Sequence, residues 1–452
     1  MRIAIIGAGF TGLTAALRLS EKGHQVIIFE KEKDPGGLAT GFKRKNWDWS
    51  CEYFFHHLFT SDKAAKKLIS DLSLDSKLFY THPKTSIFKN GQISQFDSPF
   101  SLLKFPHLSF PQKIRAGLVT AYLKLNNNWQ ELEKIKATSW LKKFYGEKTY
   151  QVLWKPLLRA KFGEFYNQIP ASWFWARIKK RSSKLGYLEG GFQVLIDKIV
   201  EEIKKNKGEL ILGKEIKDIQ INNSQLSPRA EPRGEAILNY QFDKVVFTTP
   251  TSVFLKILKN TSDGGRLNVS EAMTPPRWRK VGKLKMIGVL NLILELKEKF
   301  LTDDTYWLNV NDNSFPFVAV VEHTNFVDKS HYGGHPILYV GGYYPQNHRY
   351  FKMSKEAILR EWLPYLQKIN PKFNQLFPRS GIPLRGTIIN YQLFSNLYAQ
   401  PIVPLNYSKF IPSYQTPVKN VFLACMQQVY PWDRGINYAI EEGEKIAQLV
   451  SL

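Results

Sequence analysis

The stretch RIAIIGAGFTG (residues 2–12) decides the fold class of this chain. RIAIIG is typical of a short buried strand, and the glycines that follow it have G-x-G-x-x-G spacing. Gly7 permits a tight turn, Gly9 lets the backbone approach a pyrophosphate, and Gly12 lets the next helix pack on the sheet. The motif therefore predicts a strand, a phosphate-binding turn and a helix, in that order, within a dinucleotide-binding unit.

The residues after the glycines complete this unit. LTAALRLSEKG is typical of a helix, and HQVIIFE is typical of a second strand that ends at Glu30. A carboxylate at this point accepts hydrogen bonds from a ribose 2′-hydroxyl, which argues against a 2′-phosphorylated cofactor. The helix N-terminus presents free N–H groups to the diphosphate. We therefore expect the nucleotide to be bordered by Phe10, Thr11, Glu30 and Lys31.

The composition indicates a large globular protein that favours anionic partners. The 452 residues, 43% of them hydrophobic, are enough for a sizeable core in two or three domains. Two cysteines make no disulfide framework and fit a reducing compartment. The net charge of +24 favours acidic partners, although no nucleic-acid motif is evident, so we expect no nucleic acid partner. We expect a cytoplasmic protein; attachment to an anionic surface at the inner face of the membrane and a merely solvated lysine-rich surface both stay open.

The order of strand and helix patterns predicts a discontinuous nucleotide domain. The first unit has too few strands for a doubly wound sheet, so later segments have to complete it. We expect residues 223–236 to form a polar hairpin tip or loop between two later strands. The predicted nucleotide domain comprises residues 1–80, 186–258 and 400–452, and the predicted substrate domain comprises a mostly helical part, 81–185, and a mixed sheet part, 259–399.

Several motifs together resemble one group of flavoproteins. The motifs are GAGFTGLTAALRL, PGGLAT, GYLEGGFQVLIDKI, VVFTTP and VFLAC with GINYAIEEG. They are similar to segments of the flavin amine oxidases, protoporphyrinogen oxidases and phytoene desaturases. The resemblance implies an α/β fold, in which a discontinuous Rossmann-like FAD-binding domain of the glutathione-reductase type carries an inserted α+β substrate domain. It also implies that the cofactor is FAD.

The same resemblance implies where the cofactor is held. In such enzymes a glycine pair, here Gly36 and Gly37, lets the backbone pass close to the diphosphate and the flavin edge. The residue that matches Ile216 holds the adenine through its backbone. The C-terminal helix, which starts near Gly435, points its N-terminus at the flavin pyrimidine ring, where the helix dipole favours negative charge. The other residues that the resemblance places at the cofactor are Leu38, Ala39, Met426 and Asn437.

Departures from the amine oxidases favour the desaturase-like branch. Asp34 and Leu38 stand where amine oxidases have arginines on either side of the glycine pair. Ala424 and Cys425 replace the usual glycine and acidic residue at the end of the last strand. Asn291 occupies the place of the lysine that amine oxidases keep near the flavin. We therefore do not expect amine oxidation.

Candidate catalytic residues follow the glycine pair and precede the last helix. Tyr53, His56 and His57 in EYFFHHLF are candidates for proton transfer, because a histidine titrates near neutral pH. In VYPWDRGIN, Trp432 is a candidate for a cavity wall and Arg434 for binding an anionic substrate.

A second basic segment is WKPLLRAKFGEF. Its cations Lys155, Arg159 and Lys161 either clamp a carboxylate or diphosphate or lie on a helix at a domain interface. No metal site is expected, because the histidine pair in HYGGHP has no third ligand nearby.

The sequence thus predicts an FAD-dependent oxidoreductase, whether oxidase, dehydrogenase or desaturase, that transfers a hydride from a substrate carbon to flavin N5. Its small-molecule substrate is expected to be apolar or anionic. Two alternatives stay open. A resemblance to the UDP-galactopyranose mutases implies isomerisation of a sugar nucleotide on reduced flavin, and a resemblance to the Rab GDP-dissociation inhibitors implies a binding protein without flavin. Neither the substrate's identity nor the oligomeric state is predicted.

Overall fold

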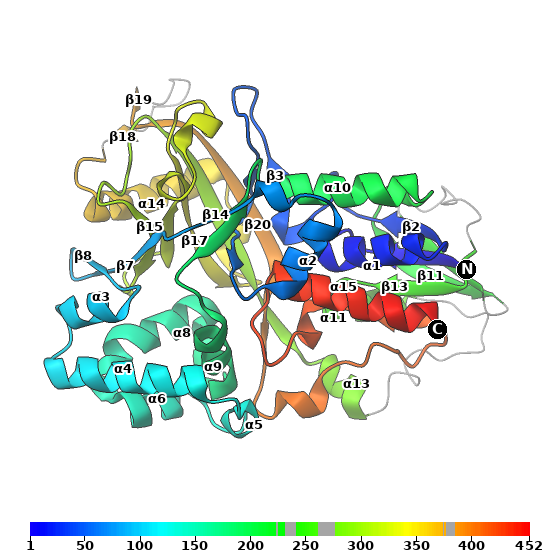
Figure 1. Cartoon of the computed structure of the whole chain (residues 1–452), viewed down its shortest axis with the longest axis horizontal. Coiled ribbons are helices and arrows are strands. Elements are labelled where there is room, and N and C mark those ends of the chain that lie inside the picture. The colour runs from blue at the N-terminus through cyan, green and yellow to red at the C-terminus, as the bar shows by residue number, and fades with distance from the viewer. Residues whose placement is uncertain (223–224, 231–240, 261–275, 374, 377–384) are drawn as a thin grey trace.

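The computed structural model describes residues 1–222, 225–230, 241–260, 276–373, 375–376 and 385–452. Figure 1 shows a sheet with its covering helices on the right and a second sheet on the left. A group of helices lies below the second sheet, and both chain ends lie on the right.

A five-stranded parallel sheet contains the N-terminal strand. Its strands are β1 (Arg2–Ile6), β2 (Gln25–Phe29), β10 (Glu209–Ile211), β13 (Lys244–Phe247) and β21 (Val421–Leu423). They lie in the order β10-β2-β1-β13-β21, and every neighbouring pair is parallel. The strands are nearly continuous apolar runs because helices or other strands cover both faces of a parallel sheet.

Three helices lie side by side on one face of this sheet (Figure 1): α1 (Phe10–Glu21), α10 (Phe192–Lys205) and α15 (Ile436–Ser451). Helix α1 contacts both of the others, and α15 also contacts α2 (Lys63–Asp71). The other face is covered by α11 (Thr251–Lys259) and by the hairpin of strands β11 (Ile216–Asn222) and β12 (Gln225–Ala230).

The parallel sheet draws its strands from three separated parts of the chain, as a discontinuous nucleotide unit requires. The α/β fold class is confirmed, whereas the exact domain boundaries stay predictions. The expectation of a polar tip at residues 223–236 was partly wrong, because residues 225–230 form strand β12. Residues 223–224 and 231–236 lie outside the described residues.

The second sheet has seven strands in the order β20-β14-β17-β16-β15-β7-β8. All neighbouring strands are antiparallel except β15 and β7, which are parallel. Helix α14 (Lys355–Ile369) packs on one face, where Leu290, Leu292 and Leu294 meet Trp362. The strands are β7 (Lys84–Lys89), β8 (Gln92–Gln95), β14 (Lys285–Leu296), β15 (Thr305–Val310), β16 (Ala319–Glu322), β17 (Ile337–Pro345) and β20 (Ile388–Ile402).

The alternation of side chains along β14 decides which residues reach the other face of this sheet. With the even-numbered leucines packed against α14, residues such as Val289 and Asn291 turn toward the parallel-sheet half of the molecule.

Residues 81–185 are mostly helical, as expected, but the segment also contains strands β7 and β8. These two strands form an antiparallel hairpin whose turn is Asn90-Gly91, with φ values of +52° and +76°. Asn-Gly is the dipeptide that such a two-residue turn prefers, because both positions require positive φ. The sequence therefore contained a signal for this hairpin that the helical interpretation passed over.

The rest of this segment is helical and lies below the seven-stranded sheet (Figure 1). Its helices are α3 (Pro99–Lys104), α4 (Phe110–Leu125), α5 (Trp129–Leu132), α6 (Ala137–Tyr145), α7 (Glu147–Thr149), a π-helical turn (Tyr150–Trp154), α8 (Lys155–Phe162) and α9 (Ala171–Lys180). Aromatic residues such as Trp154, Phe174 and Trp175 form their core. Among the helices that the structure describes, none is both long enough and apolar enough to cross a bilayer.

Three further sheets in the described part of the chain are small and consist of short strands. The remaining elements are β3 (Gly41–Phe42) with β4 (Cys51–Glu52), β5 (Leu58–Phe59) and β6 (Leu78–Thr81) with β9 (Leu185–Leu188), β18 (Gln375–Leu376) with β19 (Arg385–Gly386), and helix α13 (Pro276–Val281).

Candidate active site

The glycine motif forms the turn between β1 and α1. Gly7 has a φ of +111°, which favours glycine. A Cβ on Gly12 would lie 2.0 Å from the Gly7 carbonyl oxygen, so the close approach of α1 to this turn requires glycine. A Cβ on Gly9 would meet nothing within 4 Å, which leaves open space beside the turn. The first helical residues, Phe10 and Thr11, thus present the N-terminus of α1 to that space, an arrangement that binds diphosphates.

Glu30 lies directly after β2, beside this turn. Its carboxylate accepts hydrogen bonds from the N–H groups of Ala8 at 2.7 Å and Glu32 at 3.0 Å. The residue is buried, so these bonds fix its carboxylate where a ribose hydroxyl is recognised in dinucleotide folds. The side chain of Lys31 is exposed and pairs with Glu32 at 3.1 Å.

The glycine pair lies against the first turn. The Gly36 N–H donates to the Ala8 carbonyl at 2.8 Å, and a Cβ on Gly37 would lie 3.2 Å from the Gly9 Cα. Both members of the pair have positive φ, +121° and +62°. Two bare backbone segments therefore lie together, which fits the diphosphate of a dinucleotide. The next two residues are Leu38, which lines the cavity described below, and Ala39, which is buried.

The C-terminal segment reaches the same region. The Ala424 N–H donates to the Phe247 carbonyl at 2.8 Å, next to the pairing of β13 with β21. A 3₁₀ turn (Met426–Gln428) follows, in which Met426 is half-buried. Helix α15 then begins after Gly435, and both Gly435 and Ile436 line the cavity. The positive end of the helix dipole thus lies at the cavity wall, where it favours negative charge.

The side chain of Asn437 lines the cavity and also links two helices. Its Oδ1 accepts hydrogen bonds from the N–H groups of Ala64 and Ala65 at 2.9 and 3.1 Å, and its Nδ2 donates to Glu441 at 2.8 Å. The amide therefore ties α15 to the first turn of α2, and its expected contact with the flavin stays a prediction. Ile216 is buried in β11, and the expected adenine contact through its backbone stays a prediction.

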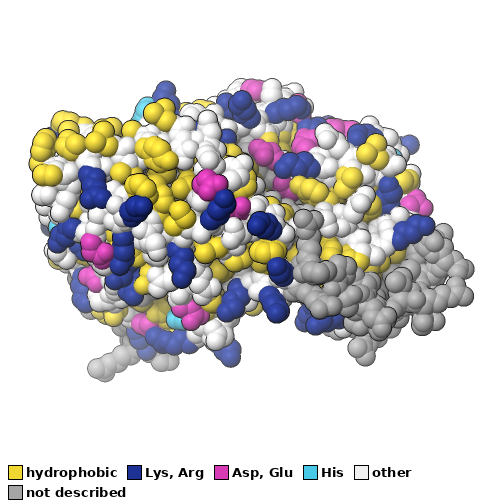
Figure 2. Space-filling model, turned by 90° about the horizontal axis from the view of Figure 1, so that it is seen from below, with side chains coloured by type: hydrophobic (Ala, Val, Ile, Leu, Met, Phe, Trp, Pro, Cys, Tyr) yellow, Lys and Arg dark blue, Asp and Glu magenta, His cyan; other side chains and the backbone are white. Residues whose placement is uncertain are grey.

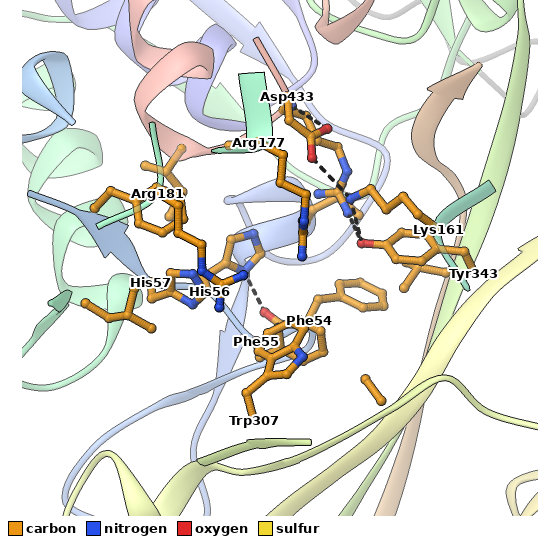
Figure 3. Close-up of a pocket in the computed structure, with 18 of the residues that line it drawn as sticks. Phe54, Phe55, His56, His57, Lys161, Arg177, Arg181, Trp307, Tyr343 and Asp433 are labelled. Carbon is orange, nitrogen blue, oxygen red and sulfur yellow. Dashed lines mark hydrogen bonds and ion pairs between the residues drawn. The ribbon is translucent and has the colours of Figure 1, made fainter. Parts of the chain in front are cut away.

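A cavity of about 260 Å³ adjoins these loops (Figure 3). Leu38 and Gly435 both line it, so it begins where the glycine pair and α15 meet. Its other walls come from the segment 54–59, from helices α8 and α9, and from strands β14, β15 and β17.

One wall is aromatic. Phe55 packs edge-to-face on Trp307, with ring centroids 4.5 Å apart, and Phe54 lies beside them (Figure 3). Such a wall favours a hydrocarbon or ring system.

Asn291 of β14 is a buried polar residue on this cavity. Its Nδ2 donates to the Tyr53 carbonyl at 3.4 Å, whereas its Oδ1 has no partner in the described part of the chain. A Cβ on Gly341, which faces it on β17, would lie 2.1 Å from that oxygen, so glycine is required there. A buried amide oxygen without a hydrogen-bond partner destabilises the fold, so Asn291 is a candidate for a hydrogen bond to a bound ligand.

The cavity wall formed by α9 carries an excess of positive charge. Five cationic side chains and two carboxylates line the cavity. Helix α9 contributes Arg177 and Lys180, and Arg181 follows at its end. Among the described residues no carboxylate pairs with Arg177 or Arg181, and both extend into the cavity (Figure 3). Burial lowers the pKa of Arg177 and lowers that of Arg181 to about 10; the charges of Asp433 near Arg177 and of Asp97 near Arg181 offset this lowering only in part.

The other two cations, Lys161 and Arg434, form a network with Asp433 and Tyr343. Lys161 lies 3.6 Å from Asp433, and the Tyr343 hydroxyl accepts from Arg434 at 2.7 Å and from Lys161 at 3.3 Å. Burial alone would raise the pKa of Tyr343, but Arg434 and Lys161 outweigh it, and the net pKa is lowered. Arg434 therefore lies at the cavity, where we expected an anion-binding residue.

Both histidines line the cavity but do not titrate near neutral pH in the free protein, contrary to our expectation. Burial, assisted by Arg434, lowers the pKa of His56 to about 4. Burial and Arg181 lower the pKa of His57 to about 3. His56 shares a hydrogen bond of 2.5 Å with the Phe54 carbonyl, whereas the buried Nδ1 of His57 has no partner within the described chain.

Tyr53 and Trp432 lie behind the cavity rather than on it. The Tyr53 ring stacks on Phe394 with centroids 4.0 Å apart. Trp432 stacks on Trp175 at 5.1 Å, and the Lys180 ammonium lies 4.5 Å from its ring centroid. Trp432 therefore supports a cavity cation instead of forming the wall.

The anion-binding residues were only partly foreseen. Lys155 and Arg159 do not line the cavity. Lys155 instead donates to Gln151, and Arg159 lies over the Tyr166 ring. The cations Arg177, Lys180 and Arg181 were missed. Their signal was ARIKKR after an aromatic run, in which spacings of three and four place cations on one helix face.

The chain belongs to the family of flavin-containing amine oxidoreductases, whose family model matches residues 10–451. It is therefore an FAD-dependent oxidoreductase, and the predicted cofactor and enzyme class are confirmed. The glycine turns and Glu30 fit FAD, because they leave bare backbone and one fixed carboxylate along a path that leads to the cavity.

Individual proteins and solved structures of this kind are also similar to the chain. A 15-cis-phytoene desaturase from Synechococcus elongatus is 25% identical over 246 residues, which cover 49% of this chain and 52% of the desaturase. The match thus spans about half of that relative. An oxidoreductase from Methanosarcina mazei is 18% identical with a TM-score of 0.72, covering 99% of this chain and 100% of that one. A reduced UDP-galactopyranose mutase is 15% identical with a TM-score of 0.71, covering 100% and 95%. At these identities the structures show the fold alone.

Proposed function

We propose that this FAD-dependent oxidoreductase removes a hydride from a carbon atom of a substrate that has an apolar body and an anionic group. The observation that carries the proposal is the cavity, in which the aromatic wall at Phe55 and Trp307 lies across from the unpaired Arg177 and Arg181 (Figure 3). Apolar walls hold a hydrocarbon, and enclosed cations that form no salt bridge with the described residues gain most from a carboxylate or phosphate. Because of these cations, a wholly apolar substrate, such as the phytoene that the desaturase relative is named for, fits the cavity less well.

When bound, FAD would supply the two-electron acceptor for the hydride of a substrate C–H bond, and a second hydrogen would leave the substrate as a proton. The chain's own residues have to hold the substrate, exclude water and accept that proton. Arg177 and Arg181 bind the anionic group, and the aromatic wall orients the rest.

His57 is the proton acceptor in this proposal. Its Nδ1 is buried and has no hydrogen-bond partner among the described residues, and the low pKa of His57 keeps the ring neutral, so that this nitrogen is open to a proton. The second cause of that low pKa is the charge of Arg181. A substrate anion at Arg181 offsets this charge, so the pKa of His57 rises when substrate binds and the ring becomes a stronger base.

The test is anaerobic bleaching of the flavin band by paired compounds. The oxidised protein is mixed with farnesyl diphosphate, oleoyl phosphate and a long-chain fatty acid, and with their neutral alcohols or esters. We expect bleaching by at least one anionic member and by none of the neutral partners. Bleaching by phytoene or by a neutral alcohol at the same rate as by its anionic partner would overturn the requirement for an anionic group.

A second candidate function is isomerisation of a sugar nucleotide, because the same cations suit a diphosphate and the fold matches that of a UDP-galactopyranose mutase. It is tested by incubating the dithionite-reduced protein with UDP-galactose. Conversion without any change in the flavin spectrum would favour this candidate. Absence of both conversion and binding at millimolar concentration would remove it.

A further inference from the structure

Helix α4 carries a row of apolar side chains on the outside of the protein. Phe110, Ile114, Leu118 and Tyr122 recur every four residues and Leu125 follows, so they share one face. Their exposed fractions are 67%, 42%, 68%, 53% and 80%. A single exposed apolar residue needs no explanation, but a contiguous group of this size indicates an interaction surface.

Neighbouring helices extend this row. The Lys113 ammonium donates to the Leu103 carbonyl at 2.8 Å, and Arg115 donates to the Phe144 carbonyl at 2.6 Å. These bonds fix α3 and the end of α6 against α4. The exposed side chains of Phe100, Leu103 and Phe144 therefore join the row, and the three elements together are called the α4 surface.

The charge along the α3 and α4 part of this surface is of one sign. From Ser98 to Gln130 the sequence contains Lys104, Lys113, Arg115 and Lys124 and no aspartate or glutamate. The Lys104 ammonium lies 4.2 Å from the Phe100 ring centroid, so cation and apolar ring are neighbours. Figure 2 shows apolar and basic side chains interleaved over the helical part of the molecule.

We propose that the α4 surface docks the protein on an anionic lipid bilayer. The apolar row would enter the boundary between headgroups and acyl chains, and the lysines would reach the phosphates, since long basic side chains bury their stems and keep their charge at the interface. A second copy of this chain is a poorer occupant, because a twofold contact through the basic α3 and α4 segments would bring like charges together.

The docking surface and the cavity share a wall. Helix α9 packs against α4, and the Lys124 ammonium at the end of α4 donates to the Arg181 carbonyl at 2.6 Å. Because Arg177 lies on this same α9, docking would hold the anion-binding wall of the cavity one helix away from the bilayer. The docking proposal does not depend on the proposed reaction, because it concerns binding alone.

The test is co-sedimentation of the FAD-loaded protein with vesicles of phosphatidylglycerol and phosphatidylcholine at low salt. The variant Phe110→Ser/Leu118→Ser removes two of the most exposed apolar side chains without changing charge. The matched control is Ile389→Ser/Leu397→Ser, which removes two exposed apolar residues of β20. The flavin absorbance and circular dichroism of both variants establish that they are folded.

We expect the wild type and the control to bind the anionic vesicles. The α4 variant should bind them at least about tenfold more weakly, because apolar burial contributes to interfacial affinity. Vesicles of phosphatidylcholine alone should bind the wild type more weakly. The proposal is overturned if the wild type does not sediment with anionic vesicles, or if the α4 variant sediments as well as the control, which would show attraction by general charge. Lipid-free dimerisation that only the α4 variant abolishes would also overturn it and would assign the surface to a second copy.

Discussion

At the scale of single residues, Glu52 shows how a buried carboxyl can tie two distant segments of the chain together. Its Oε1 accepts from the Phe192 N–H at 2.7 Å, at the start of α10, and its Oε2 accepts from the Tyr187 hydroxyl at 2.8 Å. The residue is fully buried, and burial raises its pKa to about 7 in spite of these two bonds. Part of the stability of the fold therefore depends on the protonation of one side chain.

The variant Glu52→Gln should be more stable than the wild type at pH 8. An unfolded glutamate ionises near pH 4.5, whereas folded Glu52 ionises near 7. Between these values the folded state binds more protons, so its advantage, complete below pH 4.5, is lost as the pH rises to 7. The glutamine keeps an acceptor for Phe192 and carries no charge, so we expect a gain of about 1–3 kcal/mol at pH 8 and none at pH 4.5.

Urea unfolding across this pH range measures the difference between variant and wild type. The difference cancels other titrating groups, including the buried histidines, whose depressed pKa values destabilise the fold as the pH falls. A constant difference at all pH values would contradict the assigned pKa of Glu52.

At the scale of elements, α9 is the helix that relates packing to substrate binding. Its first turns bury Trp173 and Trp175 in the helical core, and its last turn extends Arg177 and Lys180 into the cavity. The position of these cations is therefore set by one helix, because its buried tryptophans hold that helix in place.

The variant Arg177→Met/Arg181→Met should lose affinity for inorganic pyrophosphate by about 100-fold or more, because hydrogen bonds to charged groups contribute about 1.5–3 kcal/mol each and every 1.4 kcal/mol is about tenfold in affinity. The variant Arg177→Lys/Arg181→Lys keeps the charge and should retain part of the affinity. Arg159→Met on the outer side of α8 is the control. Calorimetric titration of the FAD-loaded proteins decides the point, and equal affinities for wild type and methionine variant would refute the assigned anion site.

At the scale of the whole molecule, the nucleotide site is an assembly of three distant segments. Three segments come together only because β1, β13 and β21 are neighbours in one sheet. They are residues 7–12, the glycine pair and the start of α15. Binding of FAD should therefore stabilise the fold as a unit.

Protein stripped of FAD should gain about 2.7 kcal/mol in unfolding free energy when FAD is supplied at one hundred times its dissociation constant. The variant Gly12→Ala should lose flavin, because its Cβ would lie 2.0 Å from a carbonyl oxygen, whereas Gly117→Ala on α4 meets nothing within 4 Å and should retain it. The flavin content per chain and the melting temperature with and without FAD report both effects. Full flavin occupancy in folded Gly12→Ala would contradict the close packing of α1.

The sequence alone determined the N-terminal βαβ unit, the cofactor and the family, because glycine spacing and apolar runs act within a few residues of one another. It also contained the signal for the β7–β8 hairpin in Asn90-Gly91. Only the tertiary structure decided which cations share the cavity and which polar groups are occupied. The Asn437 side chain accepts hydrogen bonds from the start of α2. Trp432 lies behind Lys180, and Arg177 faces Trp307 across the cavity. The physical reason is that burial, unpaired charge and pKa depend on contacts between segments far apart in the chain, which no local pattern specifies.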